Sequence, residues 1–89
     1  MRERGLSIQQ QLMCCFILTY TQRHGFPPTV REIAAWVGYR GMSSLQLALR
    51  ALEHQGYLHR HPQSCRSLTL TAPGRQVAQR WQVQVLEVA

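Results

Sequence analysis

Two short helical patterns joined by a tight turn set the strongest constraint on this chain, in GFPPTVREIAAWVGYRGMSSLQLALRALEHQGYL at residues 25–58. The paired prolines end any preceding helix, because neither has an N–H group to continue a backbone ladder. Thr29 and Glu32 then have the spacing of a capping box, and Gly38 predicts a stop in the left-handed conformation. The sequence therefore predicts a helix of about two turns over residues 30–37.

Another helix follows the turn GYRG, and two starts are open for it. Gly41 can serve as the N-cap, or Ser43 and Gln46 can form a capping box. The stop is clearer and falls at Gly56. The inward face of this helix carries Leu45, Ala48, Leu49 and Leu52. At roughly 100° per residue, the outward side carries Ser43, Leu47, Arg50 and His54, with Gln46 on its flank.

A first helix is predicted over residues 8–24, with a capping box of Ser7 and Gln10 at its start and Gly25 at its end. One apolar stripe at helical spacing consists of Ile8, Leu12, Cys15, Phe16 and Thr19. Further sides of the same helix carry Met13, Ile17, Tyr20 and Leu18. Because so much of the circumference is apolar, we expect another element to cover this helix.

The last third of the chain predicts a hairpin and a final helix. Two short runs at residues 57–59 and 67–71 are separated by a polar loop that contains proline, which is typical of a hairpin. The final helix starts near Thr71 or Thr69. Its apolar stripe consists of Val77, Ala78, Trp81, Val85 and Val88. The segment VQVLEV also alternates, so a strand is the alternative there.

This order of elements predicts a mainly α fold with a small β-hairpin, the winged helix-turn-helix. With 89 residues the chain is expected to form one domain over residues 1–89, with a core at 7–71 and a helical extension at 72–89. In such a fold the second helix of the pair enters the major groove of DNA, and the hairpin forms the wing.

The charge balance favours a polyanionic partner. The net charge is +6, and all ten basic residues are arginines. A small surface with this charge attracts nucleic acid, so double-stranded DNA is the expected partner. The four acidic residues are scattered, and no nucleophile is paired with a base at a recognisable spacing. We therefore expect a protein that is not an enzyme, with no cofactor and no small-molecule substrate.

Cysteine usage and hydropathy predict the setting of the chain. Three cysteines with no paired spacing favour neither a disulfide framework nor a zinc module. The residues that raise the question of a metal are His54, His59, His61 and Cys65, whose spacing matches no ligand pattern. No apolar run reaches the roughly 18 residues of a transmembrane helix. We expect no metal and no membrane, and a place in a reducing cytoplasm on the nucleoid.

The segment QQLMCCFILTYTQRHGFPPTVREIAAWVGYRGMSSLQLALRALEHQGYLHR resembles the amino-terminal DNA-binding domain of the LexA repressors. GFPPTVREIA and VGYR carry the likeness, which covers roughly residues 7–71. The resemblance implies a winged helix-turn-helix regulator of repressor type from a bacterium or phage. We expect no counterpart of the family's self-cleaving domain. We therefore expect neither induction by cleavage nor that domain's dimer interface.

The resemblance also implies which residues meet DNA. The family's reading positions fall on Gly41, Ser43, Ser44, Gln46 and Leu47. Gly41 stands in place of the usual serine, Ser43 in place of an asparagine, and Gln46 and Leu47 in place of glutamates, so the family's operator is not carried over. We expect base contacts from Ser43, Ser44, Gln46 and Leu47. Contacts with the backbone or minor groove are expected from Thr29, Arg31, Arg40, Gly41, Arg50, Arg60 and Arg66.

Two questions stay open from the sequence. The apolar surfaces of the first and last helices can pack together within one chain, or they can form a homodimer or partner surface at Val77, Trp81, Val85 and Val88. The exposed position expected for Leu47 also favours an alternative function, a winged-helix module that binds another protein and has lost the reading of DNA sequence.

Overall fold

The computed structural model of the chain describes residues 6–38, 41–61 and 68–88, with side chains in the last segment described up to residue 82. The elements in order are α1 (Ile8–His24), α2 (Val30–Val37), α3 (Met42–His54), β1 (Leu58–Arg60), β2 (Leu68–Leu70) and α4 (Ala72–Val88). The predicted mainly α fold with a small hairpin between the third and fourth helices is confirmed.

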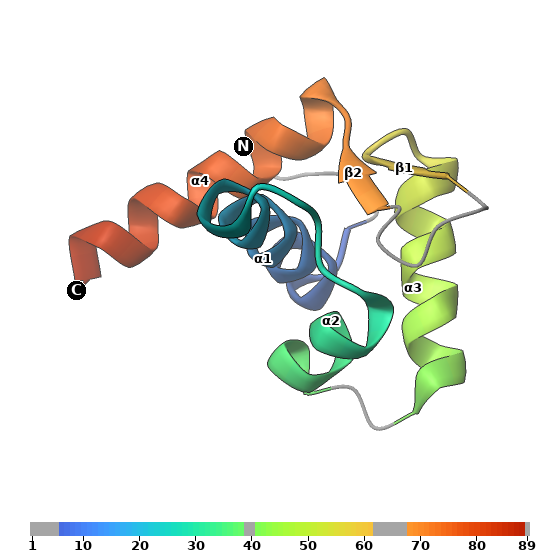
Figure 1. The fold of residues 1–89 in the computed structure, drawn as a ribbon. Coiled ribbons are helices and arrows are strands. Elements are labelled where there is room, and N and C mark those ends of the chain that lie inside the picture. The colour runs from blue at the N-terminus through green and yellow to red at the C-terminus, as the bar shows by residue number, and fades with distance from the viewer. Residues whose placement is uncertain (1–5, 39–40, 62–67, 89) are drawn as a thin grey trace.

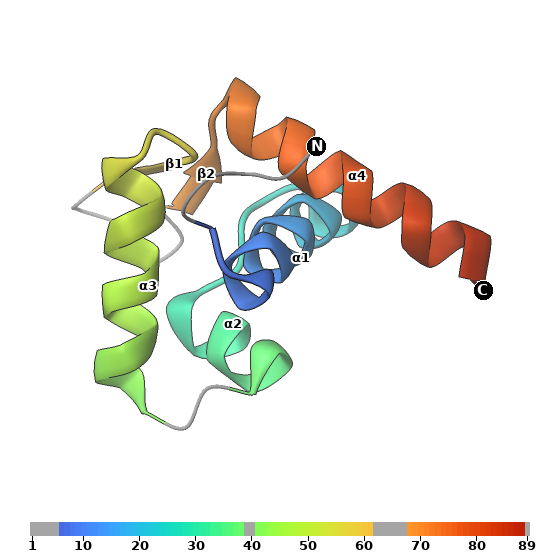
Figure 2. The same cartoon turned by 180° about the vertical axis from the view of Figure 1, so that it is seen from behind.

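The helices are arranged around α1. Figures 1 and 2 show α1 at the centre of the molecule, α4 along one side of it, and α3 at the opposite margin. The short helix α2 lies beside α1, and the chain then turns into the start of α3. The two-stranded sheet lies beside the last turns of α3. This arrangement leaves the outer side of α3 uncovered by any other helix or strand of the described chain.

Both predicted capping boxes are confirmed. The Ser7 hydroxyl accepts a hydrogen bond from the Gln10 backbone N–H at 3.1 Å, and the Ser7 N–H donates to the Gln10 side chain at 3.0 Å. The same reciprocal pair joins Thr29 and Glu32, at 3.2 and 2.8 Å. Each box satisfies two backbone groups that a helix start would otherwise leave without a partner. The sequence therefore defines both starts locally.

The structure decides between the two predicted starts of α3. Gly41 is the N-cap, with φ −132° and ψ 144°, and no side chain caps this end. The alternative, a capping box of Ser43 and Gln46, is wrong, because the helix already begins at Met42. At the other end, Gly56 has φ 88°, and the Tyr57 N–H donates to the Leu52 carbonyl at 2.9 Å. This is the Schellman pattern, which only glycine adopts cheaply.

The buried side of α1 differs from the expected stripe. Its buried apolar residues are Met13, Cys14, Cys15, Ile17 and Leu18. Ile8, the first member of the expected stripe, is 65% exposed, and Thr19 is also exposed. Because α1 is packed by α2, α3, α4 and β2, its apolar residues spread around the helix and no single stripe marks the core.

The expectation that another element covers α1 is confirmed, and that element is α4. Val77 and Ala78 are buried in the common core. The Trp81 indole N–H donates to the Gln11 side-chain oxygen at 3.0 Å, and the Gln82 amide donates to Thr19 at 2.9 Å. The segment VQVLEV continues the helix to Val88, so the strand alternative is wrong.

The helix α2 is attached to α1 by an aromatic contact and a hydrogen bond. The rings of Phe16 and Trp36 stack with centroids 4.9 Å apart. The Tyr20 hydroxyl donates to the Glu32 carboxylate at 3.0 Å, and Ile33 is fully buried. A helix of eight residues is not stable alone in water, so these contacts hold it in place.

The hairpin is short and antiparallel. Leu58 pairs with Leu70, His59 with Thr69, and Arg60 with Leu68. Leu58 and Leu68 are buried and anchor the sheet to the core. The strands begin and end within a residue or two of the predicted runs. The tip at residues 62–67, with Cys65 and Arg66, lies outside the described residues.

The start of α4 packs closely on Tyr57, in the segment between α3 and β1. The Thr71 hydroxyl accepts from the Gly74 N–H at 3.3 Å, so Thr71 is the cap that the sequence allowed. Gly74 is buried, and a Cβ atom placed on it would overlap the Tyr57 carbonyl oxygen. This glycine is therefore required by the close approach of two backbone segments.

Replacing Gly74 tests that approach. In an open helix Gly→Ala stabilises by about 1 kcal/mol. Here we expect Gly74→Ala to lower the free energy of unfolding by about 2 kcal/mol, because the methyl group forces the backbones apart. Urea unfolding followed by circular dichroism measures the change. Gln76→Ala, at an exposed position of the same helix, should shift stability by less than about 0.5 kcal/mol. A stabilising Gly74→Ala would contradict the packing.

The cysteines of α1 are expected to be unreactive in the folded chain. Cys14 is fully buried and Cys15 is 7% exposed. Burial raises the pKa of the Cys15 thiol, and a hydrogen bond with Thr19 offsets this in part. Since the thiolate is the nucleophile, alkylation near pH 8 should be at least about tenfold slower in the native chain than in urea. The variant Cys65→Ser isolates the two thiols, and equal rates would show that α1 opens readily.

Candidate nucleic-acid interface

The two faces of α3 differ sharply in exposure. Leu45, Leu49 and Leu52 are fully buried, as the inward face predicts. Ser43, Ser44, Leu47 and Arg50 are exposed. Leu47 is 66% exposed, on the opposite side of the helix from its three buried leucines. The division of this helix into a core face and an outward face is therefore confirmed.

Figure 2 shows α3 at the edge of the molecule, where no other helix of the described chain lies on its outer side. A helix presented in this way can enter the major groove, which is about 12 Å wide. The short side chains Ser43 and Ser44 lie in its first turn. Short polar groups at a helix start allow the backbone to approach base edges closely.

The flank of α3 is joined to the hairpin. The Arg60 guanidinium Nη2 donates a hydrogen bond to the Gln46 side-chain oxygen Oε1 at 3.3 Å. Both side chains are half-buried. The structure thereby brings together one expected base contact and one expected wing contact. Sequence reasoning did not find this pair, because 14 residues separate the two and no local pattern links them.

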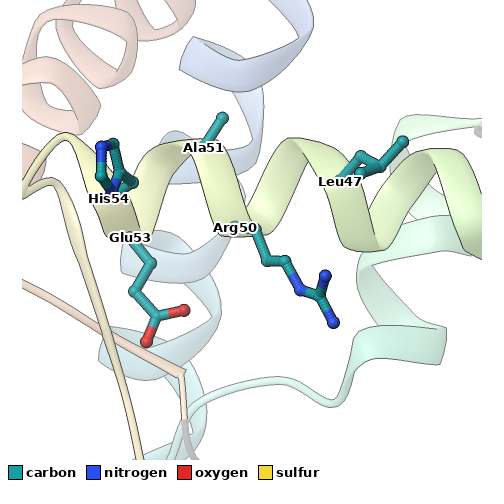
Figure 3. A pocket seen from close by; sticks show the side chains of 5 residues that line it. All are labelled: Leu47, Arg50, Ala51, Glu53 and His54. Atoms are coloured by element: carbon teal, nitrogen blue, oxygen red, sulfur yellow. The ribbon is translucent and has the colours of Figure 1, made fainter.

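A shallow depression lies on the outward side of α3 and is lined by Leu47, Arg50, Ala51, Glu53 and His54. Figure 3 shows Leu47, Ala51 and His54 along one side of the helix and Arg50 and Glu53 along the other. The charged groups that line the depression are one arginine and one glutamate, so the α3 surface itself is close to neutral there.

The other expected contacts lie in different environments. Arg31 on α2 and Gly41 at the start of α3 are exposed. The Thr29 hydroxyl accepts from the Glu32 N–H as the cap of α2, and the residue is half-buried. Arg40 and Arg66 fall outside the described residues. Of the seven expected backbone contacts, Arg31, Gly41 and Arg50 are therefore exposed in the described chain.

Two of the four residues expected at a dimer or partner surface pack within the chain. Val77 is 1% exposed against α1, and Trp81 is half-buried there. For these two residues, the structure therefore shows the first of the two alternatives, which is packing within one chain. Val85 and Val88 belong to the part of α4 whose side chains are not described, so their role stays a prediction.

The described residues 6–38, 41–61 and 68–88 contain no group of three histidine, cysteine or acidic side chains placed to hold a metal ion. The His59 and His61 rings lie edge to face, with centroids 4.6 Å apart. In the same ranges, no helix has the length and apolarity that crossing a membrane requires.

The model of the LexA DNA-binding domain matches residues 3–67, which include α1, α2, α3 and β1. The chain belongs to the LexA DNA-binding domain family. The resemblance carried by GFPPTVREIA and VGYR is therefore confirmed. The family is a DNA-binding one, not a catalytic one.

Relatives of this LexA-family chain are repressors from several bacteria. It is 40% identical over 70 residues to LexA repressor 2 of Geobacter sulfurreducens, covering 79% of the chain and 34% of the relative. It is 40% identical over 72 residues to the LexA repressor of Carboxydothermus hydrogenoformans, covering 81% and 35%. The chain thus spans about a third of the length of the curated relatives it matches.

Solved structures show the same fold at low sequence identity. S. aureus MepR bound to ethidium bromide matches with a TM-score of 0.72 at 18% identity, over 99% of this chain and 63% of MepR. A hypothetical protein matches with a TM-score of 0.78 at 13% identity, over 96% of this chain and 26% of that protein. These similarities show the fold only, and they extend beyond the family match to include α4.

Paired substitutions on α3 test the two faces of the LexA-family helix. Leu49→Ala should destabilise by about 2–5 kcal/mol, because it leaves a cavity beneath the helix. Leu47→Ala, the same change two residues away, should alter stability by less than about 0.5 kcal/mol. Thermal unfolding of both variants measures the difference. Comparable losses would show that Leu47 is covered in the folded chain.

Proposed function

We propose that this chain is a sequence-specific regulator that binds double-stranded DNA and acts as a repressor. The observation that carries the proposal is the open outward face of α3 in a member of the LexA DNA-binding domain family. Relatives that share 40% identity over this region are named LexA repressors. The net charge of +6 supports a polyanionic partner.

In this proposal the outward face of α3 reads bases in the major groove. Ser43 and Ser44 donate or accept at base edges, and Leu47 contacts the methyl group of a thymine. Arg31, Arg50 and the Gly41 backbone lie on the exposed side and contact phosphates. The hairpin beside α3 serves as the wing, with Arg60 at its base. Arg40 and Arg66 are assigned to phosphates from the sequence alone.

Two copies on a two-fold operator complete the proposal. A dimer would place two α3 helices about 34 Å apart, which is one turn of DNA. The projecting end of α4, seen in both Figures 1 and 2, is the proposed place of contact between copies.

A second function is favoured by one observation, the 66% exposure of Leu47 beside the depression on α3. Exposed apolar side chains at a concave site are typical of protein-binding surfaces. In this alternative, the chain is a winged-helix module that binds another protein through the outward side of α3. Salt separates the two functions, because phosphate contacts release counterions and an apolar interface does not.

Selection of sites from random duplex DNA with the purified chain tests the proposal. We expect enrichment of a two-fold motif, and affinity that falls with a log–log salt slope near −0.9 for each phosphate contacted. Arg50→Ala should weaken binding to all sequences by about tenfold. Arg23→Ala, which removes one exposed arginine from the last turn of α1, is the matched control and should leave affinity nearly unchanged.

The outcome that contradicts this function is equally clear. If no motif is enriched, and if Arg50→Ala binds DNA with the same low affinity as the wild type, α3 does not contact DNA bases. Binding to a protein that is lost in Leu47→Ala and insensitive to salt would then establish the alternative.

A further inference from the structure

The hydrogen bond between Arg60 and Gln46 joins the wing to the flank of the proposed reading helix. Nη2 of Arg60 and Oε1 of Gln46 are 3.3 Å apart, and both side chains are half-buried rather than free in solvent. Arg60 is the last residue of β1 and pairs with Leu68, which is buried in the core. The backbone of Arg60 is therefore fixed by strand pairing, and its guanidinium restrains the Gln46 side chain through the hydrogen bond.

The chemistry of the pair fixes which way the Gln46 amide faces. A guanidinium has five N–H donors and no acceptor, so only the oxygen of the amide can face it. The nitrogen Nε2, on the other arm of the planar amide, then carries the two donors that are directed elsewhere. The assignment of oxygen and nitrogen, often ambiguous for glutamine, is decided here by the partner.

This orientation changes which base edge Gln46 can match. A free glutamine reads adenine in a bidentate way, because its oxygen accepts from N6 and its nitrogen donates to N7. Arg60 occupies one lone pair of Oε1 and holds that oxygen toward the hairpin, so the amide is less free to turn its oxygen and nitrogen together to one adenine edge. Gln46 then offers mainly donors, and the positive charge of Arg60 lies beside it. The base edge that offers two acceptors, O6 and N7, is that of guanine.

We infer that Arg60 determines specificity through Gln46: by holding the Gln46 oxygen, it makes Gln46 select guanine instead of adenine. The inference rests on the proposed function, since it assumes that the outward side and flank of α3 meet base edges. Arg60 acts here as a positioning residue, whose effect on base choice passes through the amide of Gln46.

The test compares base preferences of the full chain and its variants by selection from random duplex DNA. Gln46→Ala first identifies the position that Gln46 reads, as the one whose preference is lost. The wild type should prefer guanine there. Arg60→Met keeps the length of the side chain and removes its donors, so the preference should shift toward adenine by about tenfold. Arg60→Lys restores a donor to Oε1 and should keep guanine.

Arg50→Met is the matched control, because it removes the same charge from the outward side of α3 and leaves the Arg60–Gln46 bond in place. It should weaken binding to all sequences and leave the preference for guanine unchanged. Circular dichroism of each variant establishes that it is folded. If Arg60→Met does not fold, Arg60→Ala takes its place in the same comparison.

The results separate this inference from the proposed function. Loss of any enriched motif in the wild type itself would overturn the proposed function and this inference with it. A wild-type motif in which the Gln46 position prefers adenine, or in which Gln46→Ala alters no position, overturns the inference alone. The inference is also overturned if Arg60→Met keeps a preference for guanine at this position that is as strong as the preference in Arg50→Met.

Discussion

The burial of α1 is the interaction on which the rest of the fold depends. Met13 and Cys14 are fully buried, and the helix is packed by α2, α3, α4 and β2. Gln10, in the first turn, forms the capping box with Ser7 and also links α1 to α3. Its side-chain N–H donates to the Ala48 carbonyl of α3 at 3.3 Å. The orientation of α3, and with it the outward face, is therefore set by contacts with α1 and β1 and not by α3 alone.

Sequence reasoning succeeded wherever a short stretch decides the outcome. Ser7 and Gln10, and likewise Thr29 and Glu32, define helix starts through bonds three residues apart, and Gly56 ends α3 by its own conformation. It failed for the buried side of α1, because a helix with partners on several sides has no single apolar stripe. It also left the start of α3 open, since Gly41 gives no side-chain signal.

The candidate site divides in the same way. The outward positions of Ser43, Leu47 and Arg50 follow from helical spacing and were predictable. The bond from Arg60 to Gln46 was not, because it depends on how the hairpin returns along α3. Likewise, whether Val77 faces a partner or its own chain is a question of tertiary packing, and the structure places it against α1. Local rules identify which residues face outward, and long-range contacts decide what those residues can do.

The contact between the first and last helices also bears on how the chain folds as it is made. Trp81 donates to Gln11 across 70 residues of sequence, so this part of the cover over α1 forms only after α4 has been made. During synthesis the N-terminal helix therefore emerges with apolar surface exposed until nearly the whole domain has been made. Contacts so distant in sequence form late and only when their loop has closed. A chain shortened before α4 would leave that surface open to other chains, which is a route to aggregation.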